Sequence, residues 1–442
     1  MIGGRQVLGS LDDLPVICRR WRVERILIAI PRLAPARLRQ VLDACADLKL
    51  SYKILPVSFA YLNDRQPATV LQDLAPEDLL GRRQVRFDPG EIRPRLRGRR
   101  VLVTGAAGSI GSEICRQVAA CEPQSLVLAD IDENGLHQLW RTLRRTHGQV
   151  RVVPEVTDIR DAPRVTQLGV EHRPDFVLHA AAHKHVPLLE RCPEEAVKNN
   201  VFGCANVLRM AEEVGAERFV LISTDKAVHP SSVMGATKRV AELVVRRHSR
   251  DSATRATVVR FGNVLGSAGS VVPIFKQQIA RGGPVTVTHP ECLRFVMTIQ
   301  EAVGLTLLAG LGMEGELFVL EMGEPIRILD LARLMITLSG GVPDVDVPIE
   351  FTGLRPGEKL REELMTEQEA TTARRVSDGV LSVQGAPPPA DLDARLAVLA
   401  AAAAVGDRPR LLALLSETAL GYEPAALRLV DTDPARAARD AS

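Results

Sequence analysis

The sequence is poor in aromatic residues, which make up 3% of its 442 residues. Three of them are tyrosines, and no tyrosine lies between Tyr61 and Tyr422. A site formed by this long middle part of the chain therefore has no phenol with which to transfer protons. Other side chains must carry any acid/base chemistry there.

Cysteine is scarce and scattered, with seven residues and no C-x-x-C pair. An odd number of separate cysteines in a large chain predicts reduced, mostly buried thiols, which are typical of cytosolic proteins. The seven are Cys18, Cys45, Cys115, Cys121, Cys192, Cys204 and Cys292.

A strong charge of one sign and long apolar runs are both missing. Charged residues make up 25% of the chain and leave a net charge of +2, so the composition does not indicate a nucleic-acid-binding protein. A local basic cluster, Arg93-Pro-Arg-Leu-Arg-Gly-Arg-Arg100, is interpreted as a solvated linker, with a phosphate or membrane contact as the alternative. Because no signal peptide or bilayer-spanning apolar run is visible, we expect a soluble, cytoplasmic protein.

Residues 1–95 are predicted to form a partial α/β domain. Apolar residues at 25–30 and 52–56 indicate buried strands, and residues 34–48 have the pattern of a helix between them. The segment is short for an independent doubly wound domain, so we interpret it as truncated or accessory. Residues 87–98 are predicted to be a linker.

Residues 96–384 alternate strand and helix signals, which predicts an α/β fold with a doubly wound parallel sheet covered by helices on both faces. Residues 385–442 change character. Pro387-Pro-Pro389 breaks the chain, and we expect a C-terminal helical appendage with a frayed end from Pro434. The expected strands of the main domain are 101–104, 125–129, 150–154, 176–179, 219–223 and 257–261.

A glycine-rich segment follows the first of these strands and precedes an amphipathic pattern. In this strand–turn–helix context, Gly105 permits a tight turn, Gly108 lets the backbone approach a pyrophosphate, and Gly111 allows close packing. The context predicts a dinucleotide site, with a plain βα turn as the alternative. The predicted contacts are Gly105, Ala107, Gly108, Ser109, Ile110 and Gly111.

Asp130 ends the next strand, near the place expected for an acid that binds the adenosine ribose. Its carboxylate would accept hydrogen bonds from the ribose hydroxyls and repel a 2′-phosphate, so NAD is favoured over NADP. Asp132 and Glu133 add negative charge close by.

Two further strand ends are candidates for the cofactor site. Asp158 and Ile159 follow the third strand and could contact adenine, although a role as helix cap explains Asp158 equally well. Ala180 and Ala181 follow the fourth strand and could leave room for a nicotinamide ribose, or they simply pack.

His183-Lys184-His185 comes next in the chain. Two histidines without a third ligand in view are poor evidence for zinc, so no metal site is predicted. Lys184 is a candidate contact to a substrate or phosphate, with ordinary loop polarity as the alternative.

The fifth strand ends in Ser223-Thr-Asp-Lys226, and Met234-Gly-Ala-Thr-Lys238 follows. Ligands of open α/β sheets bind at this carboxyl edge. Met-x-x-x-Lys has the spacing of the Tyr-x-x-x-Lys pair of short-chain dehydrogenases, with a thioether in place of the phenol. Asp225 and Lys226 are therefore candidates to share the acid and base roles. A helix cap or a mutual salt bridge is the alternative for Asp225, and Met234 is interpreted as an apolar wall or core residue.

Six motifs support one resemblance. They are Thr104-Gly-Ala-Ala-Gly-Ser-Ile-Gly111, His179-Ala-Ala-Ala-His-Lys-His-Val-Pro187, Ser223-Thr-Asp-Lys226, Met234-x-x-x-Lys238, Arg260-Phe-Gly-Asn-Val264 and Arg355-Pro-Gly-Glu-Lys359. From about residue 99 to residue 365, the chain resembles the CapD-like polysaccharide-biosynthesis proteins. These are nucleotide-sugar 4,6-dehydratases of the extended short-chain dehydrogenase superfamily.

The resemblance implies a UDP-N-acetylglucosamine 4,6-dehydratase with a Rossmann domain, a smaller substrate-binding part and tightly bound NAD. Sugar C4 would be oxidised, water eliminated across C5 and C6, and hydride returned to C6. In this scheme Thr224 binds O4, Lys238 binds the nicotinamide ribose, Asp225 is the acid and Lys226 is the base. Burial favours the uncharged forms that the last two roles need, so we expect it to lower the pKa of Lys226.

The resemblance also implies contacts to a UDP-sugar. Asn263 would hold the diphosphate, and Glu358 could accept a hydrogen bond from the uridine ribose. Arg294 and Arg355 offer forked donors for phosphate oxygens. For Arg355 the alternative is a surface arginine in the turn that Pro356-Gly357 predicts.

Two other functions stay open: a UDP-N-acetylglucosamine epimerase of the same superfamily, and a non-catalytic NAD-binding scaffold for glycan assembly. Long members of the family carry transmembrane helices upstream. If the chain is a piece of such an anchored protein, we expect it at the inner face of the membrane. We also expect a homo-oligomer.

Overall fold

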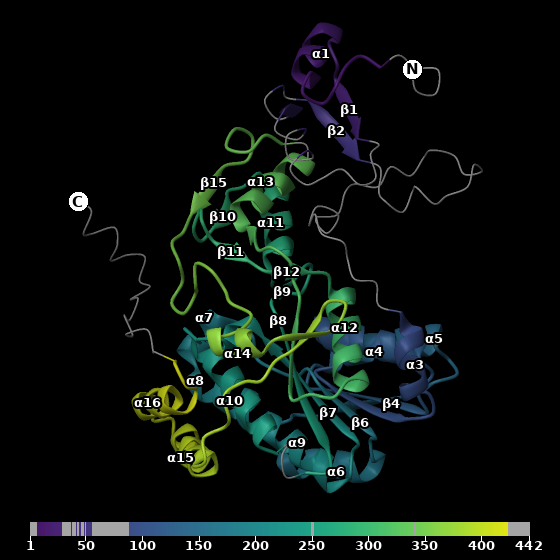
Figure 1. The fold of residues 1–442 in the computed structure, drawn as a ribbon, viewed down its shortest axis with the longest axis vertical. Helices are drawn as coiled ribbons and strands as arrows, with labels where there is room; N and C mark the ends of the chain where they lie inside the picture. The colour runs from purple at the N-terminus through teal and green to yellow at the C-terminus, as the bar shows by residue number, and fades with distance from the viewer. Residues whose placement is uncertain are drawn as a thin grey trace.

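Near-continuous apolar runs such as Phe219-Val-Leu-Ile222 form strands that are buried on both faces, as parallel strands usually are. In the computed structural model they build a nine-stranded sheet with the order β16-β17-β13-β8-β7-β6-β3-β4-β5 (Figure 1). The strands are β3 (Arg100–Thr104), β4 (Ser125–Asp130), β5 (Arg151–Val156), β6 (Phe176–His179), β7 (Arg218–Thr224), β8 (Arg255–Phe261), β13 (Leu317–Leu320), β16 (Arg374–Ser377) and β17 (Val380–Ser382). The structure describes residues 7–28, 51–54, 88–248, 252–339 and 341–422, with single positions between 29 and 50.

The strands from β5 to β13 run parallel, and β17 and β16 complete the sheet in antiparallel pairs. From β3 the chain builds outward first through β4 and β5 and then through β6, β7 and β8. This is the Rossmann arrangement, and its topological switch point lies between β3 and β6. The predicted fold class is confirmed, and each of the six predicted strands lies within two residues of its predicted bounds.

Two cores cover the two faces of the sheet. Because side chains alternate along a strand, Val101 and Val103 enter one core while Leu102 enters the other. The first core is covered by α3 (Pro89–Leu96), α4 (Ser109–Ala120), α5 (Glu133–Thr146) and α12 (Ile299–Gly312). The second is covered by α6 (Ala162–His172), α7 (Val186–Arg191), α8 (Pro193–Ala196), η3 (Val197–Gly203), α9 (Cys204–Glu213) and α10 (Val233–His248).

A small lobe has a core of its own, built from the stretches that follow β8 and β13. Its strands pair across these two stretches, β10 with β15 and β11 with β14, and β12 pairs with β9 beside the main sheet. The lobe is therefore held together by contacts between distant parts of the chain. Its elements are β9 (Asn263–Val264), α11 (Val271–Ala280), β10 (Val285–Val287), β11 (Leu293–Arg294), β12 (Val296–Met297), β14 (Ile326–Arg327), α13 (Ile328–Leu338) and β15 (Ile349–Phe351).

The N-terminal segment contains α1 (Leu14–Trp21) and a parallel pair of strands, β1 (Arg25–Ile28) and β2 (Ser51–Ile54). Both predicted strands are thus present, but the prediction that the first is buried is wrong, since Arg25 and Leu27 are exposed. The predicted helix at 34–48 lies mostly outside the described residues. The prediction of a linker at 87–98 is wrong for α3, although Arg93, Arg95 and Arg97 of the basic cluster are exposed as predicted. Ile92 and Leu96 are completely buried and pack α3 on the main domain, in contact with α12.

The predicted C-terminal helices are α15 (Leu392–Val405) and α16 (Arg408–Thr418). They dock firmly, because Leu399 and Leu415 are fully buried in the second core. Before them, α14 (Glu367–Thr372) begins with a capping box formed by Thr366 and Glu369. The end from Pro434 lies outside the described residues.

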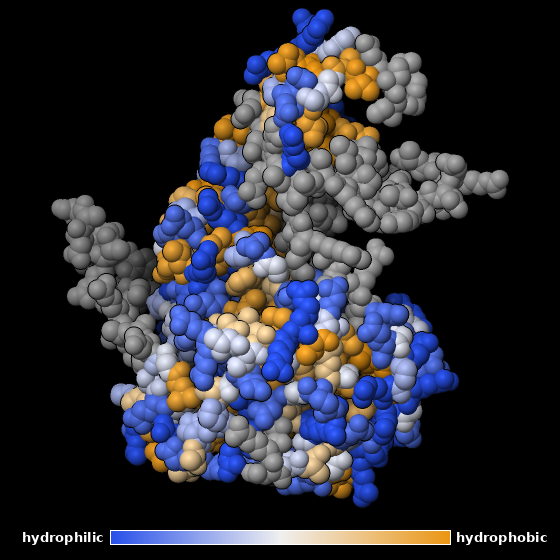
Figure 2. Space-filling view, in the orientation of Figure 1, coloured by the Kyte–Doolittle hydropathy of each residue, from blue (hydrophilic) through white to orange (hydrophobic). Residues whose placement is uncertain are grey.

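All seven cysteines are free thiols and six are buried, so the prediction of mostly buried thiols is confirmed. The surface in Figure 2 is mainly hydrophilic over α4 and α5, with apolar residues in smaller patches elsewhere. Among the described residues, no helix combines the length and apolar composition needed to cross a membrane.

Candidate active site

The glycine-rich segment turns tightly between β3 and α4. Gly105 has a φ of +69°, and a Cβ there would lie 2.5 Å from the backbone nitrogen of Ala181. At Gly111 a Cβ would lie only 1.9 Å from the carbonyl oxygen of Gly105. Both positions therefore require glycine, since any side chain would force the loop apart.

Gly108 is different, because its only close neighbour is the carbonyl oxygen of Gly105 in the same turn. It begins α4, whose first turn has neither a side-chain cap nor an acidic residue. The free N–H groups and the positive end of the helix dipole make this a suitable place for a pyrophosphate.

The Asp130 carboxylate is held beside this turn. It accepts hydrogen bonds from the backbone nitrogens of Ala107, at 2.8 Å, and Asp132, at 2.9 Å. Asp132 itself caps α5 by accepting a hydrogen bond from the backbone of Gly135. Asp130 is thus at the edge of the glycine turn, as a ribose-binding acid would have to be, although its contact with a ribose stays a prediction.

Asp158 forms a salt bridge with Arg160, with 2.7 Å between Oδ2 and Nη2. The hydrogen bonds from Arg160 lower the pKa of Asp158. The helix-cap alternative for Asp158 is wrong, because Asp161 caps α6 through the backbone nitrogen of Arg164. The Ile159 side chain is buried and packs against Gly203, so an adenine contact by these residues also stays a prediction.

At the end of β6, the backbone of Ala180 and Ala181 approaches Gly105 closely. The preceding His179 is buried, and its Nδ1 lies 2.7 Å from the Thr104 hydroxyl. Burial, helped by the charge of Lys238, lowers the pKa of His179 to about 3, so its ring is neutral. The close approach explains why small residues are needed here.

The loop that contains Lys184 is tied to two other segments. Lys184 Nζ donates to the carbonyl oxygen of Ala268 at 2.8 Å, and the Ala268 nitrogen donates to the Ser109 hydroxyl at 3.0 Å. Gly269 approaches His185, where a Cβ would lie 2.7 Å from the ring. Lys184 therefore already has a partner, and its contact with a substrate stays a prediction.

At the carboxyl end of β7, Asp225 and Lys226 form the salt bridge that was the alternative for Asp225, and their acid and base roles stay predictions. Lys226 Nζ donates to Asp225 Oδ1 at 2.9 Å and to Asn263 Oδ1 at 3.0 Å. The Thr224 hydroxyl also donates to Asp225 Oδ1, at 2.8 Å. Asp225 is completely buried, and its second oxygen, Oδ2, has no partner among the described residues. The structure thus brings three predicted site residues into contact with Asp225 or its lysine partner.

Glu362 also belongs to this cluster, although it was not among the predicted site residues. Its Oε1 lies 3.8 Å from Lys226 Nζ, and its side chain is 4% exposed. Oε2 is buried without a hydrogen-bond partner among the described residues. The only signal in the sequence was an acidic residue shortly after the Arg355–Lys359 motif.

The expected direction of the pKa of Lys226 is wrong for this arrangement. Burial alone would lower it, but the carboxylates of Asp225 and Glu362 outweigh burial and raise the pKa of Lys226. Lys226 is therefore an ammonium ion here, and it must lose a proton before it can act as a base.

Two predicted residues lie on α10. Met234 is buried in the second core, which confirms its interpretation as a core residue. Lys238 is 6% exposed, and its Nζ donates to the carbonyl oxygen of Ile222 at 2.6 Å. Burial lowers the pKa of Lys238. Its amine is thus held at Ile222, two residues before Thr224 on β7.

Two of the residues predicted to contact the phosphates and the uridine ribose are paired with each other. Arg294 forms a salt bridge with Glu358 at 2.9 Å, and Glu358 also accepts a hydrogen bond from Thr288. Arg355 is exposed in the turn that contains Gly357, which has a φ of +77°. The surface-turn alternative therefore describes Arg355 in this structure, and contacts of these residues with a UDP-sugar stay predictions.

A second cluster of buried charges lies behind the site. Ser223, next to Thr224, donates to Glu242 Oε1 at 2.6 Å. Arg260 binds Glu242 at 2.7 Å and Glu369 at 2.9 Å. Burial alone would raise the pKa of Glu242, but Arg260 lowers it to about 2. This cluster joins β7, β8, α10 and α14 and so fixes the strand end that carries Thr224 and Asp225.

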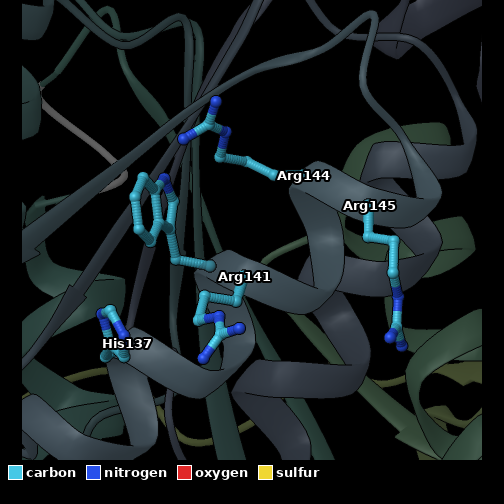
Figure 3. Close-up of a pocket in the computed structure, with 5 residues that line it drawn as sticks. His137, Arg141, Arg144 and Arg145 are labelled. Atoms are coloured by element: carbon cyan, nitrogen blue, oxygen red, sulfur yellow. The ribbon is translucent and has the colours of Figure 1, made fainter.

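A separate hollow lies on the surface of α5 (Figure 3). Its lining residues are His137, Trp140, Arg141, Arg144 and Arg145, and the Arg144 guanidinium stacks 5.0 Å from the centre of the Trp140 ring. The hollow contains none of the predicted site residues and is not part of the candidate active site.

Comparison with known proteins identifies close relatives over most of the chain. Residues 101–383 match the family described as "Polysaccharide biosynthesis protein". The chain is 48% identical over 370 residues to "Probable polysaccharide biosynthesis protein EpsC" of Bacillus subtilis (strain 168), covering 83% of this chain and 62% of the relative. It is 47% identical over 367 residues to "Capsular polysaccharide biosynthesis protein CapD" of Staphylococcus aureus, covering 82% and 61%. The chain thus spans about three fifths of the length of these two relatives.

More distant relatives carry the names of specific reactions. The chain is 32% identical over 280 residues to "UDP-N-acetylglucosamine 4,6-dehydratase (inverting)" of Campylobacter jejuni subsp. jejuni serotype O:23/36 (strain 81-176), covering 62% of this chain and 79% of that protein. Among solved structures, that of Pen from Bacillus thuringiensis has 34% identity and a TM-score of 0.60, covering 65% and 89%. The family match and the two long alignments confirm the resemblance inferred from the motifs: the chain belongs to the family of polysaccharide biosynthesis proteins.

Proposed function

We propose that the protein dehydrates a UDP-N-acetylhexosamine, UDP-N-acetylglucosamine in the first instance, to its 4-keto-6-deoxy form. The observation that carries this proposal is the contact between the buried Asp225 and the partly buried Lys226 at the end of β7. A carboxylate and an amine at this edge can replace the missing tyrosine in acid/base chemistry. The relative named as a UDP-N-acetylglucosamine 4,6-dehydratase supports the choice of substrate.

The residues around the glycine turn fit NAD. The uncapped start of α4 suits a pyrophosphate, and Asp130 suits the adenosine ribose. Lys238 would bind the nicotinamide ribose. Bound there, NAD would supply the hydride chemistry, an oxidation at sugar C4 followed by a reduction at C6.

Residues at the end of β7 transfer the protons. The Thr224 hydroxyl already donates to Asp225, so it can accept the O4 proton of the sugar while passing its own to the carboxylate. Asp225 then holds a proton, which it gives to the C6 oxygen as that oxygen leaves as water. The Lys226 amine takes the C5 proton and returns one to C5 after the hydride reaches C6. One proton enters from O4 and one leaves in the water molecule, so the residues end as they began.

Heavy water provides the test. The protein with NAD is incubated with UDP-N-acetylglucosamine in deuterium oxide, and the product is analysed by mass spectrometry. We expect loss of one water and one deuterium at C5, because the proton on Lys226 exchanges with solvent. Bound NAD without loss of water or uptake of deuterium would support the scaffold instead.

An epimerase is the second candidate, because other relatives of 32% identity over 286 residues are named "UDP-glucose 4-epimerase". Epimerisation leaves the mass of the nucleotide sugar unchanged in ordinary water. A product of unchanged mass would therefore favour the epimerase and contradict the proposed dehydration.

A further inference from the structure

Glu362 is a buried acid that the scheme above does not use. It belongs to the segment that follows the Arg355–Lys359 motif and runs along β11, where Arg361 pairs with Leu293. Its neighbour Glu363 points outward and binds His229, so the two adjacent acids have opposite surroundings. Glu362 Oε2 is buried and has no hydrogen-bond partner among the described residues. Burying a carboxylate oxygen in this way is costly, so it calls for a functional explanation.

Four charged groups face Glu362: Lys226, Asp225, Arg294 and Lys359. Two of the cations have other partners, because Arg294 binds Glu358 and Lys359 donates to the carbonyl oxygen of Val228. Lys226 is the cation within salt-bridge distance, at 3.8 Å. Burial raises the pKa of Glu362 despite Lys226, so this carboxyl binds a proton more readily than an ordinary glutamate.

The proposed reaction needs such a group. Lys226 starts as an ammonium ion between two carboxylates, yet it must be a free amine when the C5 proton is removed. Asp225 cannot take the ammonium proton at that moment, because it already holds the proton from O4. A second acceptor is required close to Lys226.

We propose that Glu362 is a positioning residue that takes the ammonium proton of Lys226 during elimination and returns it at the end of the turnover. The inference rests on the proposed dehydration.

The proton balance closes over one turnover. At the start, Lys226 is protonated and both carboxylates are ionised. Asp225 gains the O4 proton, and an N–H bond of Lys226 breaks as an O–H bond forms on Glu362. The amine then takes the C5 proton, Asp225 gives its proton to the leaving oxygen, and Lys226 returns a proton to C5. Glu362 finally reprotonates Lys226, which restores the starting state without any oxidant or reductant beyond NAD.

The separation of 3.8 Å is too long for proton transfer, which needs roughly 2.6–3.2 Å between the heavy atoms. A small movement of the Lys226 side chain away from Asp225 and toward Glu362 would shorten this distance enough for proton transfer. Protonation of Asp225 favours that movement, because it removes the negative charge that holds Lys226 at 2.9 Å.

The test compares Glu362→Gln with Glu363→Gln in the full chain with bound NAD, using UDP-N-acetylglucosamine. A glutamine keeps the shape but cannot take a proton. We expect kcat of Glu362→Gln to fall about 100-fold, with KM and NAD content close to those of the wild type. Substrate should produce a persistent NADH absorbance, because C4 oxidation proceeds and elimination stalls. Glu363→Gln should behave as the wild type, since its carboxylate faces solvent.

The pH profile separates this role from a structural one. In Glu362→Gln, Lys226 must lose its proton to solvent, so kcat should rise by about tenfold per pH unit below the pKa of Lys226. The wild type should show a flatter profile. If Glu362→Gln does not fold, Glu362→Asp is used, and a flat profile there supports the inference whereas a steep one contradicts it.

The outcomes distinguish the two proposals. If the wild type releases water from the sugar but Glu362→Gln matches it in kcat, NADH signal and pH profile, the role of Glu362 is wrong and the dehydration stands. If the wild-type product keeps the mass of the substrate, the dehydration is wrong and the inference falls with it.

Discussion

Two clusters of buried charges lie back to back at the end of β7, and they differ in how completely they are paired. In the paired cluster, Arg260 binds Glu242 and Glu369, and all four carboxylate oxygens accept hydrogen bonds. In the unpaired cluster, Lys226 lies near Asp225 and Glu362, and each of these carboxylates has one buried oxygen without a partner among the described residues. The unpaired oxygens belong to the cluster that the proposed chemistry uses.

Adjacent residues of one strand serve the two clusters. Side chains alternate along β7, so Ser223 binds Glu242 in the paired cluster while Thr224 binds Asp225 in the unpaired one. Complete pairing holds a backbone segment in place, because any movement would leave a buried charge exposed to apolar surroundings. Incomplete pairing leaves acceptor positions for a ligand or a proton. The comparison therefore predicts that substitutions in the paired cluster reduce stability and that substitutions in the unpaired cluster reduce turnover.

The largest effect is expected for Asp225→Asn, which removes the proton-carrying group and keeps its shape. Dehydration should fall by about 100-fold to 10,000-fold, while NAD stays bound. The free energy of unfolding should change by less than about 1 kcal/mol, because the variant also removes a buried carboxylate with an unpartnered oxygen. Product formation by mass spectrometry and denaturant unfolding measure the two quantities.

Lys226→Ala should also abolish dehydration, but it leaves two buried carboxylates without their cation and so should be less stable. Turnover at the wild-type rate in either variant would remove that residue from the mechanism. Asp225→Asn is the cleaner test for this reason.

Arg260→Met should have the opposite profile. It leaves the buried Glu242 and Glu369 with Arg239 as their one remaining cation within salt-bridge distance among the described residues, so the free energy of unfolding should fall by about 3–5 kcal/mol. Arg255→Met is the matched control on the same strand, because its partner Glu314 is exposed and such pairs contribute less than about 1 kcal/mol. Equal losses of stability in the two variants, measured by denaturant unfolding, would contradict the role given to the paired cluster.

Acid should weaken the paired cluster in a defined pH window. The pKa of Glu242 is about 2 in the folded protein against a usual 4.5. Its carboxylate therefore stabilises the fold fully above about pH 4.5, and this contribution, on the order of 3 kcal/mol, is lost as the pH falls toward 2. The slope of unfolding free energy against pH should be smaller in Glu242→Gln. An unchanged slope would show that other carboxyl groups determine the acid sensitivity.

A smaller effect is expected at the cofactor. Asp130→Ala should weaken NAD binding by about tenfold and reduce the preference over NADP, because the carboxylate no longer repels a 2′-phosphate. Part of the loss should come from the glycine turn, since Asp130 also accepts a hydrogen bond from Ala107. Dissociation constants for both nucleotides give the ratio, and an unchanged ratio would count against the ribose assignment.

Much of the main domain could be predicted because strands buried on both faces leave continuous apolar runs between helical patterns. The small lobe could not, because its strands pair residues such as Val285 and Ile349 that are distant in the sequence. The position of Asp225 and Lys226 at the end of a strand was predicted, and their contact was the alternative to separate acid and base roles. Glu362 did not stand out, because the adjacent Glu363 is chemically identical to it. Which of the two is buried depends on tertiary structure, here the segment whose Arg361 pairs with Leu293. The pKa of Lys226 was mispredicted for the same reason, since its second carboxylate partner comes from that segment.

Met234→Tyr should have the smallest effect on activity, and it tests whether a phenol is what the site lacks. Met234 is buried in the second core together with Val233 and Ala236, so a tyrosine would have to place its hydroxyl among apolar side chains or displace the start of α10. Thr224 and Asp225 already offer a path for the O4 proton, so an added phenol has no step to accelerate. We expect turnover no higher than that of the wild type and a loss of about 1–3 kcal/mol in unfolding free energy. A large increase in turnover would mean that the O4 proton limits the reaction and that the Thr224–Asp225 path does not carry it.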